Sequence, residues 1–289
     1  MNAESELIRL GSTDLQVPRL GYGAARIDAI PADQAEVLLN ALVDEGVTFI
    51  DTADCYGDSE ELIGRFLGRR MQECVVATKC GCLIAGEEGD DYTGPVVTNS
   101  IDRSLQRLGV DHLDLVFIHS CSAEQLHNGG CTEALLAARD AGKVRYTGYS
   151  GDGDDALEAI AMGVFDALQV TFNVVNQEAL AEILPAAKLA GMGVIAKRPI
   201  ANARLADAES PVHRDGSHWD AARPVLEEHG VWEDPLELSL RFILSHDVVA
   251  SAIVGTTDVD HARANVRRAA AGRLPAAAME ALHRLEPRE

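Results

Sequence analysis

Four polar side chains stand at or just beyond the ends of three predicted strands, and their types suit proton transfer to an oxygen atom. Asp51, Lys79 and His119 each end one of these strands, and Tyr56 follows Asp51 in the next turn. A phenol can donate a proton, while an ammonium, a carboxylate and an imidazole can tune and orient it. Each residue alone has a purely structural explanation, such as an ion pair or a satisfied hydroxyl. Their occurrence together on three consecutive strands favours a shared catalytic site.

The elements that must position these residues alternate between strand and helix. β-branched runs predict strands, and amphipathic periodicity predicts helices. After a β-hairpin at 7–21, strands are predicted near 20–23 and at 47–51, 73–79, 113–119, 144–149, 167–170, 192–196 and 248–254. Helices are predicted at 33–45, 59–70, 97–108, 132–141, 154–162, 178–190, 233–245, 258–270 and 276–285. Pro185 predicts a start or a kink near Leu184 in the sixth helix.

This alternation predicts parallel strands, and eight of them can close into a barrel without a free edge. We therefore expect an eight-stranded parallel α/β (TIM) barrel with an N-terminal β-hairpin, forming one domain over residues 1–289. A doubly wound open sheet is the rival fold, and the missing GxGxxG motif after the first strand weighs against it. Residues 200–232 are expected to form a long rim loop, with Trp219 as a candidate wall of the site.

The charge balance argues against several classes of partner. The chain has 46 acidic and 25 basic residues and a formal net charge of −21, which disfavours nucleic acids and anionic membranes. No apolar run reaches the roughly 18 residues of a membrane span, and no N-terminal stretch resembles a signal peptide. We therefore expect a cytoplasmic protein with reduced cysteines. A cofactor that carries phosphates must find its cations locally within this negative field.

Several segments resemble those of one enzyme family. Residues 49–57 read FIDTADCYG and resemble the signature of the aldo-keto reductases. The segments 76–79 (VATK) and 116–119 (VFIH) resemble the next two active-site segments of that family. Cofactor segments are matched by GYS at 148–150, by Gln169 and by IVGT at 253–256. The match runs from the hairpin to Asn265, so the resemblance implies a nicotinamide-dependent carbonyl oxidoreductase.

The resemblance assigns a role to each of the four residues. Tyr56 would give a proton to the carbonyl oxygen while the cofactor delivers hydride to the carbon. A free tyrosine has a pKa of about 10, and Lys79 is expected to lower it by favouring the phenolate. Asp51 would pair with Lys79 and also border the cofactor, and His119 would orient the substrate oxygen by a hydrogen bond.

The resemblance also implies a nicotinamide site. Ser150 and Gln169 would bind the carboxamide, and the main chain of Gly23 and Ala24 would line the adjoining ribose. Gly151 stands where the family usually has asparagine, so a backbone contact is expected there. In the family, an aromatic that stacks on nicotinamide precedes a Ser-Pro-Leu-like run. The matching residues here are Lys197, Arg198, Pro199 and Ile200, and Lys197 stands in place of the aromatic. The side chains of Lys197 and Arg198 would bind the pyrophosphate of the cofactor, or else form ion pairs with loop carboxylates.

The last matching segment bears on the choice of cofactor. It contributes Ile253, Gly255, Thr256, Thr257, His261 and Asn265 as cofactor-binding residues. Gly255 and His261 stand where many members have lysine and arginine, which would bind the 2′-phosphate of NADP. The family as a whole favours NADP, and the loss of two cations makes NAD the alternative.

Four cysteines lie beside the catalytic residues: Cys55, Cys80, Cys82 and Cys121. They could bind a metal or respond to oxidants. We favour small filler residues and predict no metal, because no Cys-x-x-Cys spacing is present. Inactivation by oxidants through this cluster is a hypothesis that peroxide treatment tests.

The sequence therefore predicts an NAD(P)H-dependent reductase of aldehydes or ketones, acting on a small carbonyl or alcohol substrate. The reverse reaction, as in an NAD-linked sugar or alcohol dehydrogenase, is equally compatible with these residues. One alternative is a cofactor-sensing regulatory subunit on the same fold with little turnover. A third, weaker alternative is a metal-dependent lyase or hydrolase on a barrel. The rim loops, which set substrate choice in barrels, are expected near residues 82–95, 120–131 and 200–232.

Overall fold

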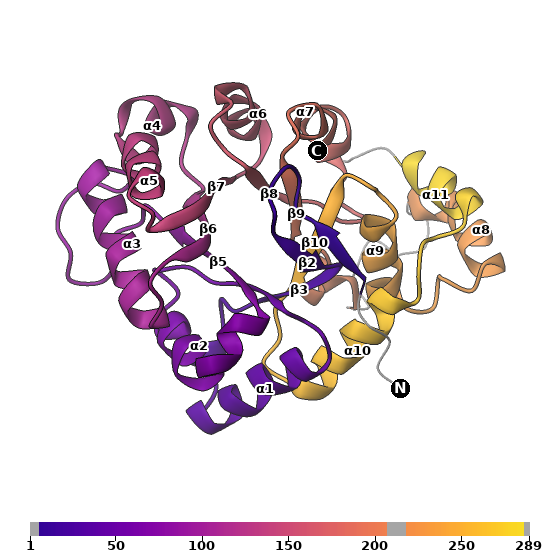
Figure 1. Ribbon diagram of the computed structural model, residues 1–289. Coiled ribbons are helices and arrows are strands. Elements are labelled where there is room, and N and C mark those ends of the chain that lie inside the picture. The colour runs from indigo at the N-terminus through magenta and orange to yellow at the C-terminus, as the bar shows by residue number, and fades with distance from the viewer. Residues whose placement is uncertain (1–5, 207–217, 286–289) are drawn as a thin grey trace.

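The computed structural model describes residues 6–206 and 218–285. Eight parallel strands close into a barrel in the order β10-β3-β4-β5-β6-β7-β8-β9, with helices around the outside (Figure 1). The strands are β3 (Leu20–Gly23), β4 (Phe49–Asp51), β5 (Val75–Cys80), β6 (Leu113–His119), β7 (Val144–Ser150), β8 (Ala167–Thr171), β9 (Gly193–Lys197) and β10 (Val249–Val254). The predicted fold class, an eight-stranded parallel barrel with an N-terminal hairpin, is confirmed.

The first two strands form a separate hairpin that covers one end of the barrel. β1 (Leu7–Arg9) pairs antiparallel with β2 (Gln16–Pro18). Leu10, Leu15 and Val17 from this hairpin are buried against apolar side chains that fill the barrel interior, among them Phe49 and Phe117. The hairpin lies across the barrel end that faces the viewer in Figure 1. The opposite rim, where the strands end, is left for the functional loops.

Two glycines make room for the aromatic rings inside the barrel. A Cβ at Gly148 would stand 2.4 Å from the ring of Phe117, and a Cβ at Gly21 would stand 2.6 Å from the ring of Phe49. Real side chains cannot approach so closely, so glycine at these positions allows the large rings to fill the interior. The barrel is therefore a packed core, and only its rim can hold a ligand.

The outer helices bury one face each. In α1 (Ala32–Asp44) the buried residues recur at helical spacing, from Ala35 through Leu38, Leu39 and Leu42. The other main helices are α2 (Ser59–Leu67), α3 (Gly94–Leu108), α5 (Cys131–Asp140), α6 (Gly153–Met162), α7 (Ile183–Leu189), α9 (Pro235–Leu244) and α10 (Val259–Ala270). Among the residues described, none forms a helix that could span a membrane.

Three sequence-based boundaries are corrected. The predicted helix 59–70 ends at Leu67 and continues as the 3-10 helix η2 (Gly68–Glu73), so the next strand starts at Val75. The predicted helix 178–190 is divided into η3 (Glu178–Leu180) and α7, and the start of α7 at Ile183 confirms the helix start expected near Leu184. Pro185 stands in the first turn of α7, where its missing amide hydrogen costs no helical hydrogen bond. The loop expected at 120–131 contains α4 (Ala123–Asn128), which begins with a capping box.

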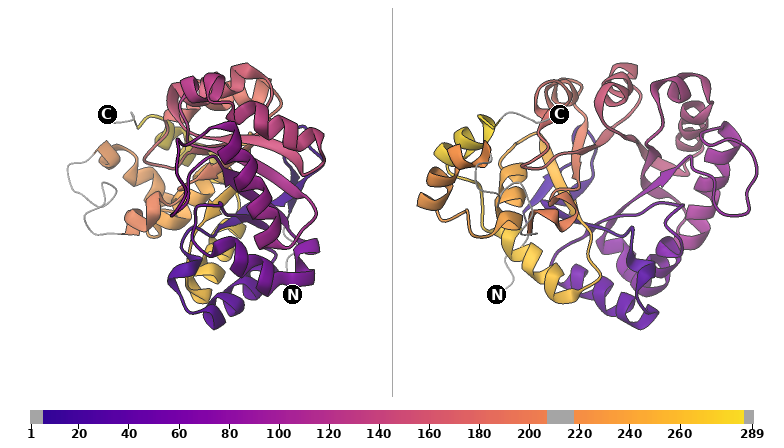
Figure 2. Two further views of the ribbon diagram at one scale, coloured as in Figure 1. Left: turned by 90° about the vertical axis from the view of Figure 1, so that its left-hand side faces the viewer. Right: turned by 180° about the vertical axis from the view of Figure 1, so that it is seen from behind.

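The loop expected at 200–232 is largely helical where it is described. It contains η4 (Ala201–Ala206), η6 (His218–Ala221) and α8 (Arg223–Glu228), and residues 207–217 lie outside the described ranges. α8 lies beside α11 (Ala276–His283) on one side of the barrel (Figure 2). Trp219 is 1% exposed within the hydrophobic core. The prediction that Trp219 forms a wall of the site is therefore wrong, because the ring serves to anchor this segment.

A pair of histidines joins α11 to the barrel. His246 follows α9, and its Nδ1 lies 2.8 Å from the carbonyl oxygen of Phe242. Its Nε2 lies 3.1 Å from Nε2 of His283 in the last turn of α11. Burial lowers the pKa of both imidazoles, because an uncharged ring is favoured beside the rings of Phe172 and Phe242.

We expect the free energy of unfolding to decrease as the pH falls below the ordinary histidine pKa of about 6.5. The unfolded chain then takes up protons that the folded pair resists, so acid favours unfolding. Urea denaturation at neutral and mildly acidic pH, for the parent and for His246→Gln with His283→Gln, measures this effect. The double variant should show a smaller pH dependence, whereas His127→Gln, which removes an exposed histidine, should match the parent. Equal pH dependence in the parent and the double variant would contradict the assignment.

Candidate active site

The ends of the barrel strands meet around one cavity of about 730 Å³, a size typical of small-molecule sites. Four side chains were predicted to act together: Tyr56 and the polar residues near the ends of β4, β5 and β6. All four line this cavity. Fifteen of the predicted site residues line the cavity: Gly23, Asp51, Tyr56, Lys79, His119, Ser150, Gln169, Lys197, Arg198, Pro199, Ile200, Ile253, Gly255, Thr256 and Thr257. The structure thus brings the four candidate catalytic residues to one rim.

A buried chain of polar contacts crosses the floor of the cavity. Nζ of Lys79 donates to Oδ2 of Asp51 at 2.7 Å and to the carbonyl oxygen of Thr52 at 2.7 Å. Nε2 of Gln169 donates to the other carboxylate oxygen of Asp51 at 2.7 Å. The hydroxyl of Ser150 donates to Oε1 of Gln169 at 2.9 Å. Because all four side chains are buried, this chain fixes their orientation.

Lys79 stays charged although burial opposes it. Burial alone would lower the pKa of this ammonium, but the negative charge of Asp51 leads the interactions that more than offset burial, so the net pKa is raised. The ion pair has side chains only 2% and 4% exposed. A charged lysine is therefore held at the base of the cavity.

Tyr56 lies between Lys79 and His119. Nζ of Lys79 is 4.8 Å from the centroid of the Tyr56 ring, and the rings of Tyr56 and His119 are 5.7 Å apart in an edge-on arrangement. Burial raises the pKa of Tyr56, and the ammonium of Lys79 opposes this only in part. The ammonium of Lys79 does act to lower the pKa of Tyr56, as predicted. The expected net decrease is wrong, because burial raises this pKa by more than Lys79 lowers it.

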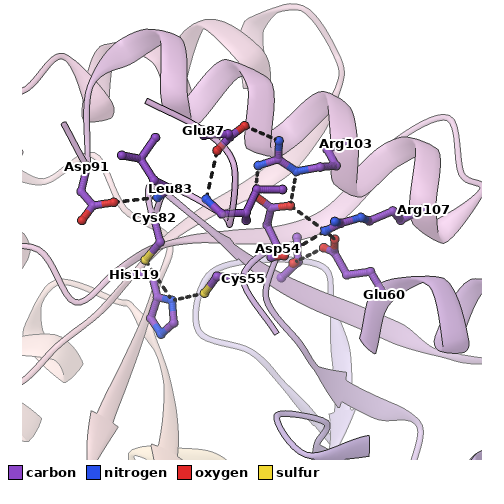
Figure 3. A network of polar contacts seen from close by, with 12 residues as sticks. Asp54, Cys55, Glu60, Cys82, Leu83, Glu87, Asp91, Arg103, Arg107 and His119 are labelled. Carbon is purple, nitrogen blue, oxygen red and sulfur yellow. Dashed lines mark hydrogen bonds and ion pairs between the residues drawn. The ribbon is translucent and has the colours of Figure 1, made fainter. Parts of the chain in front are cut away.

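The imidazole of His119 faces two thiols on one side. Its Nδ1 lies 3.5 Å from Sγ of Cys55 and 3.7 Å from Sγ of Cys82 (Figure 3). Among the described residues, these side-chain contacts of His119 use Nδ1 and leave Nε2 for a ligand. The hydroxyl of Tyr92 donates to the backbone oxygen of His119 at 2.7 Å, which holds the end of β6. Contact with Cys55 and then with His119 helps to lower the pKa of Cys82 to about 5.

A second buried network fixes the segment that carries Tyr56. Both oxygens of the Asp54 carboxylate accept from the guanidinium of Arg103, and Nη1 of Arg107 donates to Oδ1 at 2.9 Å (Figure 3). Asp54 is 2% exposed, and the guanidinium groups of Arg103 and Arg107, both partly buried, reach it from α3. Glu60 at the start of α2 adjoins the same cluster through Arg107. Removing the arginines would leave the buried carboxylate of Asp54 without a compensating charge, so these contacts hold the segment in place.

The two cations at the end of β9, Lys197 and Arg198, both pair with the carboxylate of Asp152 and also border the cavity. Nζ of Lys197 lies 3.1 Å from Oδ2 of Asp152, and Nη1 of Arg198 lies 4.0 Å from the same oxygen. Arg198 also donates to the hydroxyl of Thr171 at 3.0 Å. Burial lowers the pKa of Lys197, and Asp152 opposes this shift. Both residues line the cavity, so the ion pair leaves them beside a ligand.

Four predicted site residues lie outside the described lining of the cavity. Ala24 is fully buried, with its amide donating to the carbonyl of Asp51. At Gly151 a Cβ would stand 2.3 Å from the hydroxyl of Tyr149, which explains why no side chain occupies this position. His261 is exposed in the first turn of α10. Asn265 lies further along the same helix, where it is buried, and its Oδ1 accepts from Nη1 of Arg268 at 3.1 Å.

Sequence reasoning missed three polar residues that line the cavity: Arg26, Ser120 and Asn202. Ser120 directly follows His119, and Arg26 follows the end of β3, so their position after strand ends was a usable signal. Asn202 lies in η4 with a φ of 56°, and nothing in its sequence context indicates that placement.

Comparisons with known proteins agree with this geometry. The model of the aldo/keto reductase family matches residues 19–287. The chain is 30% identical to L-galactose dehydrogenase of Arabidopsis thaliana, over 90% of this chain and 87% of that protein. It is 30% identical to D-threo-aldose 1-dehydrogenase of a Pseudomonas species, over 83% and 86% of the two chains. A holo-form aldo-keto reductase from Bacillus halodurans superposes with a TM-score of 0.83 at 25% identity, covering 97% and 96%. The chain belongs to the aldo/keto reductase family, a family of oxidoreductases.

Proposed function

We propose that this protein interconverts a small carbonyl compound and the corresponding alcohol, using a nicotinamide dinucleotide. The observation that carries the proposal is the juxtaposition of a phenol, an ammonium and an imidazole around one cavity. Tyr56, Lys79 and His119 line that cavity, and Asp51 holds Lys79 in place. These are the groups needed to protonate an oxygen while charge develops on it.

The residues around the cavity fit a nicotinamide dinucleotide. The buried Oγ of Ser150 still offers an acceptor to a carboxamide, and the second N–H of the Gln169 amide offers a donor. Lys197, Arg198 and Arg26 offer cations to phosphate groups. When bound, the dinucleotide supplies or accepts the hydride.

The protein's own residues handle the proton. In the direction of reduction, the hydroxyl of Tyr56 donates a proton to the carbonyl oxygen, and the ammonium of Lys79 stabilises the phenolate that remains. Nε2–H of His119 donates a hydrogen bond to the same oxygen and so orients the substrate. The raised pKa of Tyr56 keeps the donor protonated at neutral pH. In the direction of oxidation, the phenolate of Tyr56 takes the proton from the alcohol.

The proposed substrates are small and hydroxylated. Two of the relatives are by name dehydrogenases of L-galactose and of D-threo-aldoses. Ser120 and Asn202 give the cavity polar side chains that can bind hydroxyl groups. A panel of aldoses, small aldehydes and ketones, assayed in both directions, identifies the preferred class.

NAD(H) is the proposed cofactor, although the family as a whole favours NADP. His261 and Asn265 share one face of α10 with Arg268, since residues 4 and 7 apart in a helix lie on the same side. The guanidinium of Arg268 is already bound to Asp234 at 2.8 Å and to Asn265. Arg263 points from another face and pairs with Glu45. Arg263 and Arg268 are therefore engaged with other groups, which disfavours a dianionic 2′-phosphate beside them.

We expect Tyr56→Phe to lower turnover by about 100-fold or more, because a positioned general acid contributes that much. Binding of the dinucleotide, measured by fluorescence titration, should stay within about two-fold of the parent. Tyr146→Phe, which removes a hydroxyl near the hairpin, is the matched control and should keep parental turnover. Equal, near-zero turnover of the parent and the Tyr56 variant would support a cofactor-sensing subunit instead.

The rate of carbonyl reduction should be level through neutral pH and fall only on the alkaline side of the ordinary tyrosine pKa of about 10. The protonated form of Tyr56 is the active one, and burial raises its pKa, so this form persists to a higher pH than in a free tyrosine. Profiles of kcat against pH at saturating cofactor measure this. A rate that already declines below pH about 9 would show that another group donates the proton.

We expect tighter binding of NADH than of NADPH. Asp234→Asn should shift this preference toward NADPH by several-fold, because it frees the guanidinium of Arg268 while asparagine still caps α9. Glu45→Gln, which frees Arg263 on another face of α10, is the matched control and should leave the ratio of the two dissociation constants unchanged. A parent that binds NADPH more tightly than NADH would contradict the assignment.

A further inference from the structure

Two thiols and an imidazole converge beside the proposed catalytic site. Cys55 follows β4, Cys82 follows β5 and His119 ends β6, so three consecutive strands deliver one group each. Their Sγ and Nδ1 atoms all lie within 4.8 Å of one another (Figure 3). All three residues are partly exposed, so a solute can reach them.

The spacing of these atoms fits a tetrahedral metal ion. Zinc binds thiolate sulfur at about 2.3 Å and imidazole nitrogen at about 2.0–2.1 Å. A tetrahedral angle between two such bonds separates sulfur from nitrogen by about 3.5–3.6 Å. In the structure, Nδ1 of His119 lies 3.5 Å from Sγ of Cys55 and 3.7 Å from Sγ of Cys82. A metal ion therefore needs little rearrangement of these side chains.

The other two cysteines that the sequence placed near the site behave differently. Cys80 and Cys121 are each 2% exposed and belong to the hydrophobic core. Sγ of Cys80 donates to the carbonyl oxygen of Phe117. The interpretation of these cysteines as small filler residues fits this pair, whereas Cys55 and Cys82 are turned toward His119.

We propose that Cys55, Cys82 and Nδ1 of His119 form a binding site for one soft divalent cation of the zinc class. Sulfur and imidazole nitrogen are the ligands that such ions prefer over carboxylate oxygen. Two thiolates neutralise the charge of the ion, and a thiol that is still protonated releases its proton to solvent on binding. Three protein ligands leave the fourth tetrahedral position for water or another small ligand. The net charge of −21 also favours the approach of a cation.

The phenol of Tyr92 supports the same arrangement. Its oxygen lies 3.8 Å from Sγ of Cys82 and donates to the backbone oxygen of His119 at 2.7 Å. One side chain thus contacts two of the three ligands, which is how groups outside a metal site orient its ligands.

The site would couple a metal ion to the proposed reaction. A neutral imidazole that binds a metal through Nδ1 carries its proton on Nε2. Nε2–H is the form of His119 that the proposed mechanism uses to orient the substrate, so a bound ion would select that tautomer. Cys55 directly precedes Tyr56, so the same ion would also restrain the segment of the proton donor. This coupling rests on the proposed function, whereas the metal site itself does not.

Titration of the reduced, chelator-treated protein with Co²⁺ tests the site directly. We expect one Co²⁺ per chain, with a thiolate-to-cobalt charge-transfer band and the intense visible bands of tetrahedral coordination. Zn²⁺ should displace the cobalt and abolish the spectrum. Absence of a thiolate-to-cobalt band in the parent would overturn the proposal, whatever the variants do.

Serine variants then identify the ligands. Cys55→Ser and Cys82→Ser should each weaken Co²⁺ binding by more than about 100-fold, since even groups outside the ligand set contribute 10–100-fold. Cys74→Ser, which changes a partly exposed cysteine outside the cluster, is the matched control and should keep the parental spectrum. Circular dichroism verifies that each variant is folded. A parental spectrum in the folded Cys55→Ser, Cys82→Ser double variant would overturn the assignment.

Tyr56→Phe separates this proposal from the proposed function. That variant should keep the cobalt spectrum while it loses turnover, because Tyr56 is not a ligand. An inactive parent that still gives the tetrahedral thiolate spectrum would refute the proposed reaction and leave the metal site standing. An active parent without the spectrum would refute the metal site alone.

Discussion

The site depends on one ion pair that the fold has removed from water. The ammonium of Lys79 and the carboxylate of Asp51 are 2.7 Å apart with side chains only 2% and 4% exposed. Either charge buried alone would cost several kcal/mol, so each requires the other. The pair joins the ends of neighbouring strands, whose register sets Asp51 opposite Ala77. Gln169 and Thr52 satisfy further polar atoms, and the position of Tyr56 is then defined relative to a fixed charge.

One end of the barrel contributes to the stability of the fold, and the other end carries the candidate active site. At one end, the hairpin and the rings of Phe49 and Phe117 pack into the interior as a hydrophobic core. At the other end, the strands finish in polar residues whose side chains would be costly to bury unpaired. The structure pairs them with one another, as in the contacts of Asp51 with Lys79 and Gln169. The rim is therefore polar and still rigid, which is what oriented proton transfer requires.

Local patterns in the sequence were enough to predict the barrel and the four candidate catalytic residues. Asp51, Lys79 and His119 end strands with clear β-branched runs, and parallel strands in a barrel bring such ends together. Properties that depend on the burial of a side chain could not be predicted from these local patterns. The net pKa shift of Tyr56 reflects desolvation that no spacing reveals, and Trp219 was misplaced because its burial depends on short helices with weak periodicity. The cysteines show the same limit, since the side to which Cys82 turns is set by the loop after β5.

Local charge explains how a strongly acidic chain can hold a ligand that carries phosphates. Four cations line the cavity, namely Arg26, Lys79, Lys197 and Arg198. Asp51 neutralises one, and the single carboxylate of Asp152 serves both Lys197 and Arg198. Four cations against two carboxylates leave an excess of two positive charges at the rim, although the whole chain carries −21. Because interactions between exposed charges are screened beyond about 10 Å, a pyrophosphate at the rim meets this local excess and little of the distant negative field.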